Sequence, residues 1–148
     1  MRAVVTRVKS ASVTIGGELH GAISQGYLVL LGVGPDDTQE TAEKLAEKIV
    51  HLRIFEDEQG RMNRDIAAVQ GSILVVSQFT LYADLGGRRP GFSHAAKPDV
   101  AKPLYEYFLA CLSDLGYPPA HGEFGADMQV ASVNDGPVTL LVDSRRTF

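Results

Sequence analysis

The sequence predicts a single α+β domain spanning residues 1–148, in which a mostly antiparallel, barrel-like sheet has two helices packed outside. Stretches of strand-like alternation are interrupted by only two helical stretches, without the regular strand–helix–strand order of a parallel sheet. The chain is 45% hydrophobic, which suffices for one well-packed core, and 148 residues are too few for two domains of ordinary size.

The first strands form a predicted hairpin. Residues 3–23 alternate between apolar and polar types, and Gly16-Gly17 supplies the positive φ angles of a two-residue turn. Arg7 is a lone charge in this alternation, which fits either a solvated face or a site residue pointing across the sheet. One side of the first strand is expected to carry Val4, Thr6 and Val8, followed by Ala11, Val13 and Ile15.

A buried strand and a helix follow. Residues 27–33 lack polar alternation, so we expect them to be buried on both faces. Asp36, Asp37 and Thr38 are typical of a helix start, and residues 52–55 return to strand character. The apolar stripe of this helix is predicted to be Ala42, Leu45, Ala46, Ile49 and Val50.

The most informative stretch is residues 71–81, where a short β-branched run, residues 73–76, reads as a central strand. Without any turn signal, it leads directly into Ser77-Gln78-Phe79-Thr80. Polar groups at a strand end indicate either a functional site or the capping of a neighbouring turn, and the spacing alone supports both interpretations equally.

The second half contains a long irregular segment, a helix and two strands. Residues 82–97 form the longest predicted loop, and loops of this length are generally functional or disordered. A helix is expected from about Asp99, with Pro103 in its first turn. Strands are predicted at 128–133 and 138–142, and a polar, frayed tail at 143–148. The helix should bury Leu104, Tyr107, Phe108, Cys111, Leu112 and Leu115.

Composition favours a soluble, cytoplasmic protein, because no stretch resembles a transmembrane helix or signal peptide and the single cysteine, Cys111, reads as a core residue. The net charge of −4 offers no general field for gripping long nucleic acid backbones. A few contacts to terminal nucleotides remain feasible, and Arg88-Arg89 is placed to supply them.

The residues offer little conventional catalytic chemistry. The four histidines are scattered, and no pair has metal-ligand spacing, so we expect neither a metal nor a cofactor. Ser77 lacks the glycine-flanked elbow of a serine nucleophile, and no phosphate-binding glycine motif occurs. An enzyme of this composition would have to use backbone groups that bind an oxyanion, with help from its substrate.

Two motifs carry a resemblance to a known family. Residues 77–81, Ser-Gln-Phe-Thr-Leu, and residues 134–139, Asn-Asp-Gly-Pro-Val-Thr, resemble the signature motifs of D-aminoacyl-tRNA deacylases. The similarity extends to residues 7–13, 53–55 and 124–130, and only the tail from residue 144 onward has no counterpart.

The resemblance implies a homodimer that hydrolyses the ester between a D-amino acid, or glycine, and the 3′-terminal adenosine of tRNA. Such proofreading rejects L-aminoacyl-tRNA and recycles the tRNA. Gly136-Pro137 is implied to be a cis peptide that enters the partner's site and meets the substrate amino group through its carbonyls, with Arg7 in support. Ser77, Gln78, Phe79 and Thr80 are the implied catalytic set.

Within this set, amides around residues 78–80 would form the oxyanion hole, Phe79 would face the terminal adenine, and the ribose 2′-hydroxyl would activate water. An older interpretation of the family makes Thr80 a nucleophile, although no basic partner is visible in the sequence. Two alternatives belong to other classes: a module that binds aminoacyl-tRNA ends without chemistry, and a structural dimerisation domain in which Gly136-Pro137 is only a turn.

Overall fold

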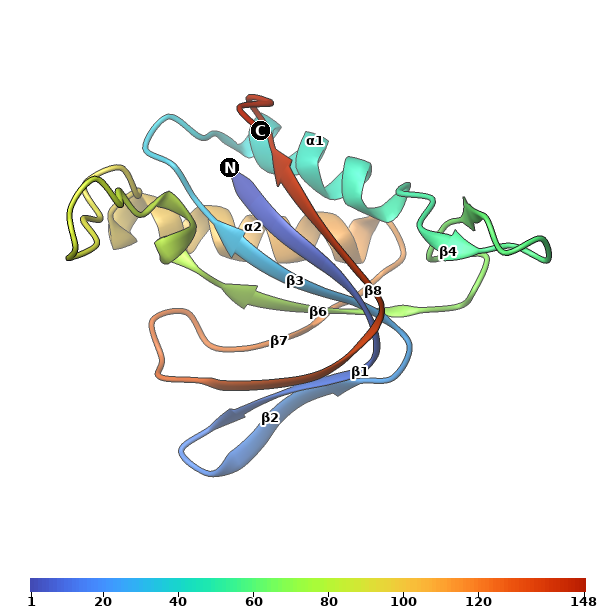
Figure 1. The fold of residues 1–148 in the computed structure, drawn as a ribbon. Coiled ribbons are helices and arrows are strands. Elements are labelled where there is room, and N and C mark those ends of the chain that lie inside the picture. The colour runs from blue at the N-terminus through green and yellow to red at the C-terminus, as the bar shows by residue number, and fades with distance from the viewer.

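The computed structural model describes residues 1–148 as a curled sheet with two helices on one side (Figure 1). The sheet has six strands in the order β2-β1-β3-β6-β7, and β8 pairs with β1. The elements are β1 (Arg2–Ile15), β2 (Glu18–Ile23), β3 (Gly26–Gly32), α1 (Gln39–Val50), β4 (Phe55–Glu56), β5 (Met62–Arg64), β6 (Ser72–Ser77), the 3₁₀-helix η1 (Phe79–Tyr82), α2 (Pro98–Asp114), β7 (Ala120–His121) and β8 (Gln129–Asp143).

The fold class predicted from the sequence is confirmed, with one addition. The pairs of β1 with β2, β3 and β8 are antiparallel, whereas β3–β6 and β6–β7 are parallel, so the sheet is mixed. The sheet nearly closes into a barrel because β7 approaches β2. At this point the ring nitrogen Nδ1 of His20 lies 2.8 Å from the His121 carbonyl oxygen. No helix is long and apolar enough to cross a membrane.

Two hydrophobic cores occupy the two faces of the central strands. The larger one fills the space between the sheet and the helices, and it takes Tyr27 and Val29 from β3. The smaller one lies inside the curl of the sheet and includes Leu28 from the same strand. The prediction that residues 27–33 are buried on both faces is therefore correct.

The first strand has the predicted side, because Thr6 and Val8 share one face and Ala11 and Val13 continue it into the small core, but the first half of the strand is buried on its other face as well. Ala3 and Val5 enter the large core while Val4 is only half-buried, and Val8 belongs to the small core. The pairing of β1 with β8 shifts register between Thr6 and Ser10, and beyond this irregularity the odd-numbered Ala11 and Val13 face the same small core as Val8.

Both helices begin close to their predicted positions. Thr38 caps α1 and exchanges hydrogen bonds with Thr41, and all five predicted stripe residues are buried. Helix α2 starts at Pro98, so Pro103 lies in its second turn and not in its first. Tyr105 is buried in place of the predicted Tyr107 and Leu115, which are half-buried and exposed, because the inward stripe follows Ala101, Tyr105, Phe108 and Leu112.

Two predictions about the strands need correction. Residues 52–54 are not a strand, since only Phe55–Glu56 pairs, with β5. The last two predicted strands form one continuous strand, β8, because residues 134–137 continue it through a bulge opposite β1 in which Gly136 has a φ of 118°. The Gly136–Pro137 peptide within it is cis, as the resemblance implied.

The C-terminal tail is not frayed, because it packs around Arg2. The guanidinium of Arg2 lies 4.5 Å from the ring centroid of Tyr82 and 5.3 Å from that of Phe148. Its Nε lies 3.3 Å from a carboxylate oxygen of Asp143, and its Nη1 donates to the Leu81 carbonyl at 3.0 Å. The tail is therefore fastened to η1 through Arg2.

Asp143 organises this cluster. Burial opposes its charge, but hydrogen bonds from the Thr147 hydroxyl, the Arg145 backbone N–H and Arg2 together hold the pKa of Asp143 below its ordinary value. The ionised carboxylate is thus the form that the folded state stabilises.

Replacing Asp143 with Asn should lower the free energy of unfolding at pH 7 by about 1–3 kcal/mol, because three hydrogen bonds lose a charged acceptor. Since the folded-state pKa is depressed, this stabilisation is present above the unfolded pKa of about 3.9 and is lost as pH falls through the folded value. Urea unfolding at pH 7 and at successively lower pH should show wild-type and variant stabilities converging. Asp36→Asn, at an exposed ion pair with Arg145, is the matched control and should change little.

Candidate functional site

The predicted catalytic segment leaves the sheet as soon as β6 ends. Ser77 is the last residue of the strand, opposite Leu31 of β3, and the Gln78 N–H donates to the Leu31 carbonyl at 2.7 Å. The chain then turns into η1, closed by hydrogen bonds from Leu81 to Gln78 and from Ala83 to Thr80. The polar cluster is therefore a strand end followed by one turn of 3₁₀-helix.

Close packing against β3 fixes the position of η1. A Cβ atom at Gly32 would lie 2.9 Å from the Gln78 carbonyl oxygen and 3.1 Å from the Leu81 Cβ. Only a residue without a side chain permits this approach, because the nearest obstruction is backbone and cannot rotate away. Together with the bond from Arg2 to Leu81, this contact fixes the orientation of the turn.

Two neighbouring backbone amides at the start of η1 have no acceptor in the protein. The N–H groups of Phe79 and Thr80 make no hydrogen bond, as expected for the first residues of a helical turn. The backbone N–H of Gln78 already donates to the Leu31 carbonyl. Of the three backbone amides predicted to bind the oxyanion, at residues 78–80, only those of Phe79 and Thr80 therefore remain free. Adjacent free N–H groups are the kind of donors that stabilise a tetrahedral oxyanion.

The Thr80 hydroxyl has a donor beside it and no base. The side-chain amide nitrogen of Gln78 donates to the Thr80 Oγ1 at 2.5 Å. An amide N–H cannot remove a proton, and no histidine, carboxylate or amine makes a hydrogen bond or ion pair with Thr80. The arrangement orients the threonine hydroxyl but does not activate it as a nucleophile.

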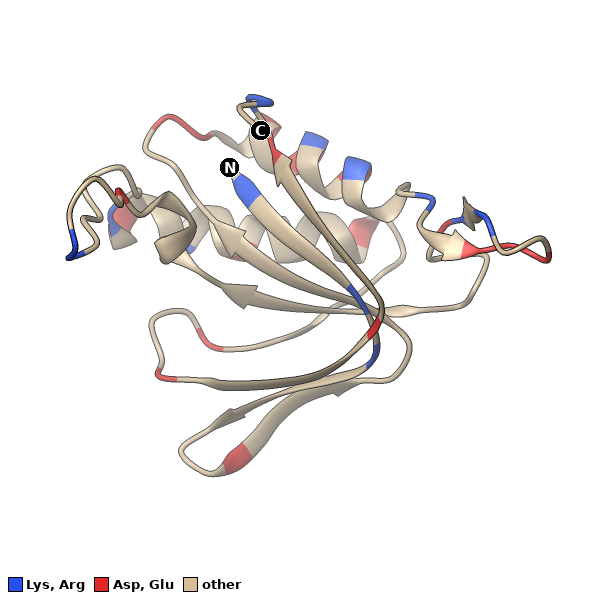
Figure 2. Ribbon diagram, viewed as in Figure 1, with Lys and Arg blue, Asp and Glu red and all other residues tan.

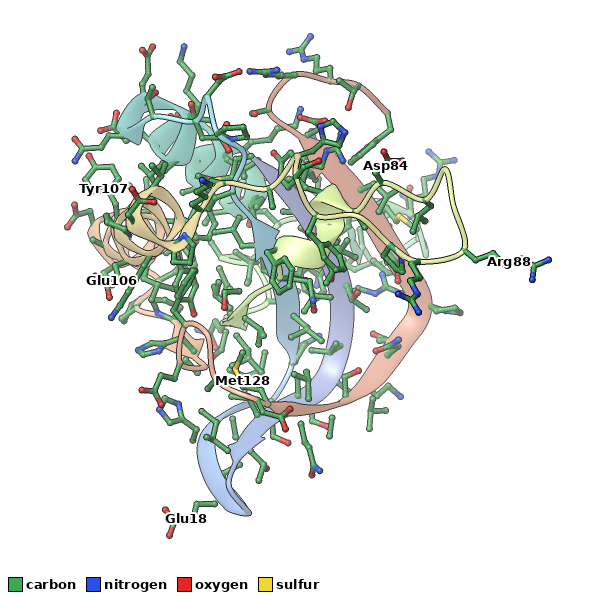
Figure 3. All side chains as sticks on the ribbon, turned by 90° about the vertical axis from the view of Figure 1, so that its left-hand side faces the viewer. Glu18, Asp84, Arg88, Glu106, Tyr107 and Met128 are labelled. Atoms are coloured by element: carbon green, nitrogen blue, oxygen red, sulfur yellow. The ribbon has the colours of Figure 1, made fainter.

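A largely apolar cleft of about 600 Å³ opens beside these residues, and Ser77, Gln78 and Phe79 line it. Phe79 is about half exposed and meets Phe92 edge to face, with ring centroids 5.0 Å apart. Figure 3 views the molecule from the side on which η1 and the loop after it lie. The opposite walls come from the start of α2 and the segment before β8, with Ala95, Ala96, Lys97, Pro98, Ala101, Tyr105, Phe124, Gly125, Ala126, Asp127, Met128 and Val130.

The sequence analysis did not single out Tyr105 or Phe92 as site residues. Burial, with a smaller contribution from Glu106, raises the pKa of Tyr105 to about 12, so its phenol stays protonated and donates to the Val75 carbonyl at 3.3 Å. A signal was present for Tyr105, since it falls on the i, i+4, i+7 stripe that starts at Ala101. Phe92 lies in the long loop, where no periodicity marks an inward residue.

The second motif is built around a buried arginine. Arg7 is 4% exposed, and its Nη1 donates to the Ile54 carbonyl at 2.6 Å while its Nε donates to the Asp135 carbonyl at 3.2 Å. The Asp135 carboxylate lies 3.5 Å from the same Nε. A Cβ at Gly136 would lie 2.9 Å from the Arg7 Nη2, so the arginine packs directly against the Gly136–Pro137 peptide.

Within one chain the two motifs lie apart. Arg7 pairs with Tyr27, which pairs with Ile73, whereas Leu31 pairs with Ser77. Arg7 and Ser77 therefore lie at positions four residues apart along the strand direction, which corresponds to about 13 Å. Arg7, Gly136 and Pro137 are absent from the lining of the cleft. The structure therefore brings Ser77, Gln78, Phe79 and Thr80 together, and separately Arg7, Gly136 and Pro137.

No three His, Cys, Asp or Glu side chains lie together in a metal-binding arrangement. His20 and His121, far apart in sequence, do approach each other, with ring centroids 5.9 Å apart at the β2–β7 closure. These two histidines do not line the cleft beside residues 77–80 and do not contact Arg7. Cys111 is buried in α2, as predicted.

Comparisons with known proteins agree with the two motifs. The family model for D-Tyr-tRNA(Tyr) deacylase matches residues 4–143. A D-aminoacyl-tRNA deacylase of Thermus aquaticus is 58% identical over 145 residues, which are 97% of this chain and 95% of that protein. One of Thermosipho africanus is 54% identical over the full length of both.

Solved structures show the same fold. One named c-Myc DNA unwinding element binding protein superposes with a TM-score of 0.92 at 45% identity, covering 97% of this chain and 98% of that one. A probable eukaryotic D-amino acid tRNA deacylase gives a TM-score of 0.85 at 16% identity, with 95% and 97% covered, and supports the fold alone. Because the family model spans nearly the whole chain and the relatives match it end to end, the protein belongs to the D-Tyr-tRNA(Tyr) deacylase family.

Proposed function

We propose that the protein is a D-aminoacyl-tRNA deacylase, a hydrolase that cleaves the ester between a D-amino acid, or glycine, and the 3′-terminal adenosine of tRNA. The observation that carries the proposal is the family match over residues 4–143, which includes both signature motifs. The reaction would spare L-aminoacyl-tRNA and return free tRNA to translation in the cytoplasm.

The cleft fits the chemistry of this ester. The exposed ring of Phe79 offers a stacking surface for the terminal adenine, and the free amides of Phe79 and Thr80 would hold the oxyanion as water adds to the ester carbonyl. Ser77 and Gln78 shape the same wall. Asp127, the one carboxylate that lines the cleft, lies on the wall before β8 and makes no hydrogen bond to Ser77, Gln78 or Thr80. The ribose 2′-hydroxyl is therefore the proposed activating group: it takes the proton of the water as the tetrahedral intermediate forms and gives its own proton to the 3′-oxygen as the intermediate collapses.

Selection of the D-configuration is assigned to Gly136 and Pro137. An enzyme that accepts many D-amino acids must fix the α-amino group and the ester carbonyl without reading the side chain. Main-chain carbonyls at Gly136 and Pro137 would bind the amino group, and an L side chain held the same way would then collide with this backbone. Arg7, which donates to the preceding Asp135 carbonyl, is proposed to hold these carbonyls in place.

A homodimer would complete the site. Since the Gly136–Pro137 segment lies about 13 Å along the sheet from the residues that line its own cleft, it is proposed to enter the cleft of a second copy. Strand β8 supports an apolar interface, because Val133 and Leu141 are more than half exposed. Figure 2 shows charged residues mainly on the helices and loops and few along the strands.

A binding module without chemistry is the main alternative, and a purely structural dimerisation domain would leave both motifs without a role. The structural relative named for DNA binding suggests a third possibility. The net charge of −4 gives little support for gripping a duplex backbone, which requires many phosphate contacts.

The first test is deacylation of matched D-, L- and glycyl-tRNA. The protein should release D-amino acid, spare the L-substrate, and release glycine at high enzyme concentration, because glycine has no side chain to collide. Arg7→Gln should reduce D-activity, whereas Lys9→Gln, at an exposed position on the same strand, should not. Binding of all three substrates without release of amino acid would identify a binding module instead.

The oxyanion-binding role of the amides predicts different effects for two substitutions at Phe79. Phe79→Ala removes the ring and keeps the N–H, whereas Phe79→Pro removes both. Proline is tolerated at the first position of a helical turn, and Gln78, at φ −147° and ψ 82°, is outside the helical region that a following proline disfavours. Relative to Phe79→Ala, the proline variant should lose about 10²–10³ in kcat.

Thr80→Ala is the companion variant, and it should keep most of the wild-type kcat because its hydroxyl has no base. A substrate ending in 2′-deoxyadenosine should be turned over far more slowly by the wild-type enzyme. An inactive Thr80→Ala together with normal turnover of the deoxy substrate would establish threonine as the nucleophile.

Sharing of the site between subunits can be tested by mixing two inactive variants. Phe79→Pro damages the cleft, and Gly136→Ala damages the inserted segment, because its Cβ would lie 2.9 Å from both Arg7 and Val138. Refolded together, they should form mixed dimers with one intact site each, which restores about one quarter of wild-type activity. Sedimentation should show a dimer, and a fully active monomer would contradict this arrangement.

A further inference from the structure

The loop between η1 and α2 contains a small, closed hairpin beside the cleft. Asp84 and Gly91 exchange backbone hydrogen bonds of 2.7 and 2.9 Å, and the Asp84 carboxylate accepts from the Gly86 N–H at 2.9 Å. The residue after this hairpin, Phe92, packs edge to face on Phe79. The position of the hairpin is thus tied to the ring proposed to stack on the terminal adenine.

The tip of the hairpin carries two unpaired cations. Arg88 and Arg89 are exposed, and neither makes a hydrogen bond or an ion pair. In Figure 3, Arg88 points away from the body of the molecule, while Asp84 lies nearer to it. By contrast, Arg2, Arg7 and Arg145 are held by carboxylates, and Arg53 donates to Asn63.

The cleft itself offers almost nothing to a phosphate. Of the residues lining it, only Lys97 is a cation, and Asp127 is an anion. A tRNA whose terminal adenosine occupies the cleft must still place the phosphates of its preceding nucleotides outside. Two adjacent guanidiniums on a closed hairpin next to the entrance match that need, because guanidinium donates to phosphate in a bidentate manner.

We propose that the hairpin of residues 84–91 binds the sugar–phosphate backbone of the tRNA acceptor end through Arg88 and Arg89. This inference rests on the proposed deacylase function and extends it beyond the terminal adenosine. Contacts of this kind carry no base information, so they strengthen binding equally for tRNAs of different sequence. They also explain how a protein of net charge −4 engages RNA with a few local contacts.

The test compares two D-aminoacyl esters, one on full-length tRNA and one on adenosine alone, which has no phosphate. For Arg88→Ala/Arg89→Ala, kcat/KM on the tRNA ester should fall by about tenfold or more, and the slope of log kcat/KM against log salt should become shallower by about 1.4. Hydrolysis of the adenosine ester should be unchanged. The double lysine variant should retain more tRNA activity than the alanine variant.

Lys48→Ala/Arg61→Ala, which removes two exposed cations remote from the cleft, is the matched control and should leave both substrates and the salt slope unchanged. The proposal is overturned if the Arg88/Arg89 variant keeps the wild-type salt slope, or if it loses the adenosine ester to the same degree as the tRNA ester. Failure of the wild type to hydrolyse either ester would overturn the deacylase function and this inference with it. Hydrolysis of both esters with no effect of the variant overturns the hairpin alone.

Discussion

The buried guanidinium of Arg7 is the constraint around which the long strands are arranged. It lies in β1 where the pairing with β8 jumps from Thr139 to Asn134, so residues 135–138 stand opposite a single residue. The Arg7 residue is only 4% exposed, so its buried guanidinium needs hydrogen-bond acceptors within the protein. The carbonyls of Ile54 and Asp135 provide them, from segments distant in sequence. Satisfying Arg7 therefore fixes the bend in β8 and the exit from α1 at the same time.

The other half of the site depends on backbone contacts and not on side-chain chemistry. The start of η1 is held by the hydrogen bond from Gln78 to Leu31, by the missing side chain at Gly32, and by Arg2 on the Leu81 carbonyl. The two hydrogen bonds occupy the Gln78 N–H and the carbonyls of Leu31 and Leu81, and Gly32 permits the close approach of the backbone. The backbone N–H groups of Phe79 and Thr80 are therefore held in a fixed position and remain free to donate hydrogen bonds.

The sequence pattern correctly predicted those elements that depend only on neighbouring residues. The hairpin at Gly16-Gly17, the capped start of α1 and the doubly buried β3 follow from the neighbouring residues alone. Features set by distant partners were missed: the parallel pairing of β3 with β6, the register shift near Arg7, and the packing of the tail on Arg2, which joins residues more than 140 positions apart. For the site, motifs located the segments, but which amides remain free depended on Leu31 of another strand.

In the proposed mechanism no side chain acts as a base at the free amides, and this restricts which esters the cleft would hydrolyse. An oxyanion hole lowers the barrier only after a nucleophile reaches the carbonyl, and Thr80 receives a hydrogen bond from Gln78 without any group to take its proton. In the proposed mechanism the activating group comes with the substrate, and the vicinal hydroxyl of a ribose is the group that an aminoacylated RNA end always carries. A DNA end lacks it. Under the proposed mechanism the cleft would bind either terminal nucleoside by stacking on Phe79, yet hydrolysis would be confined to RNA ends, because only they carry a 2′-hydroxyl next to the ester.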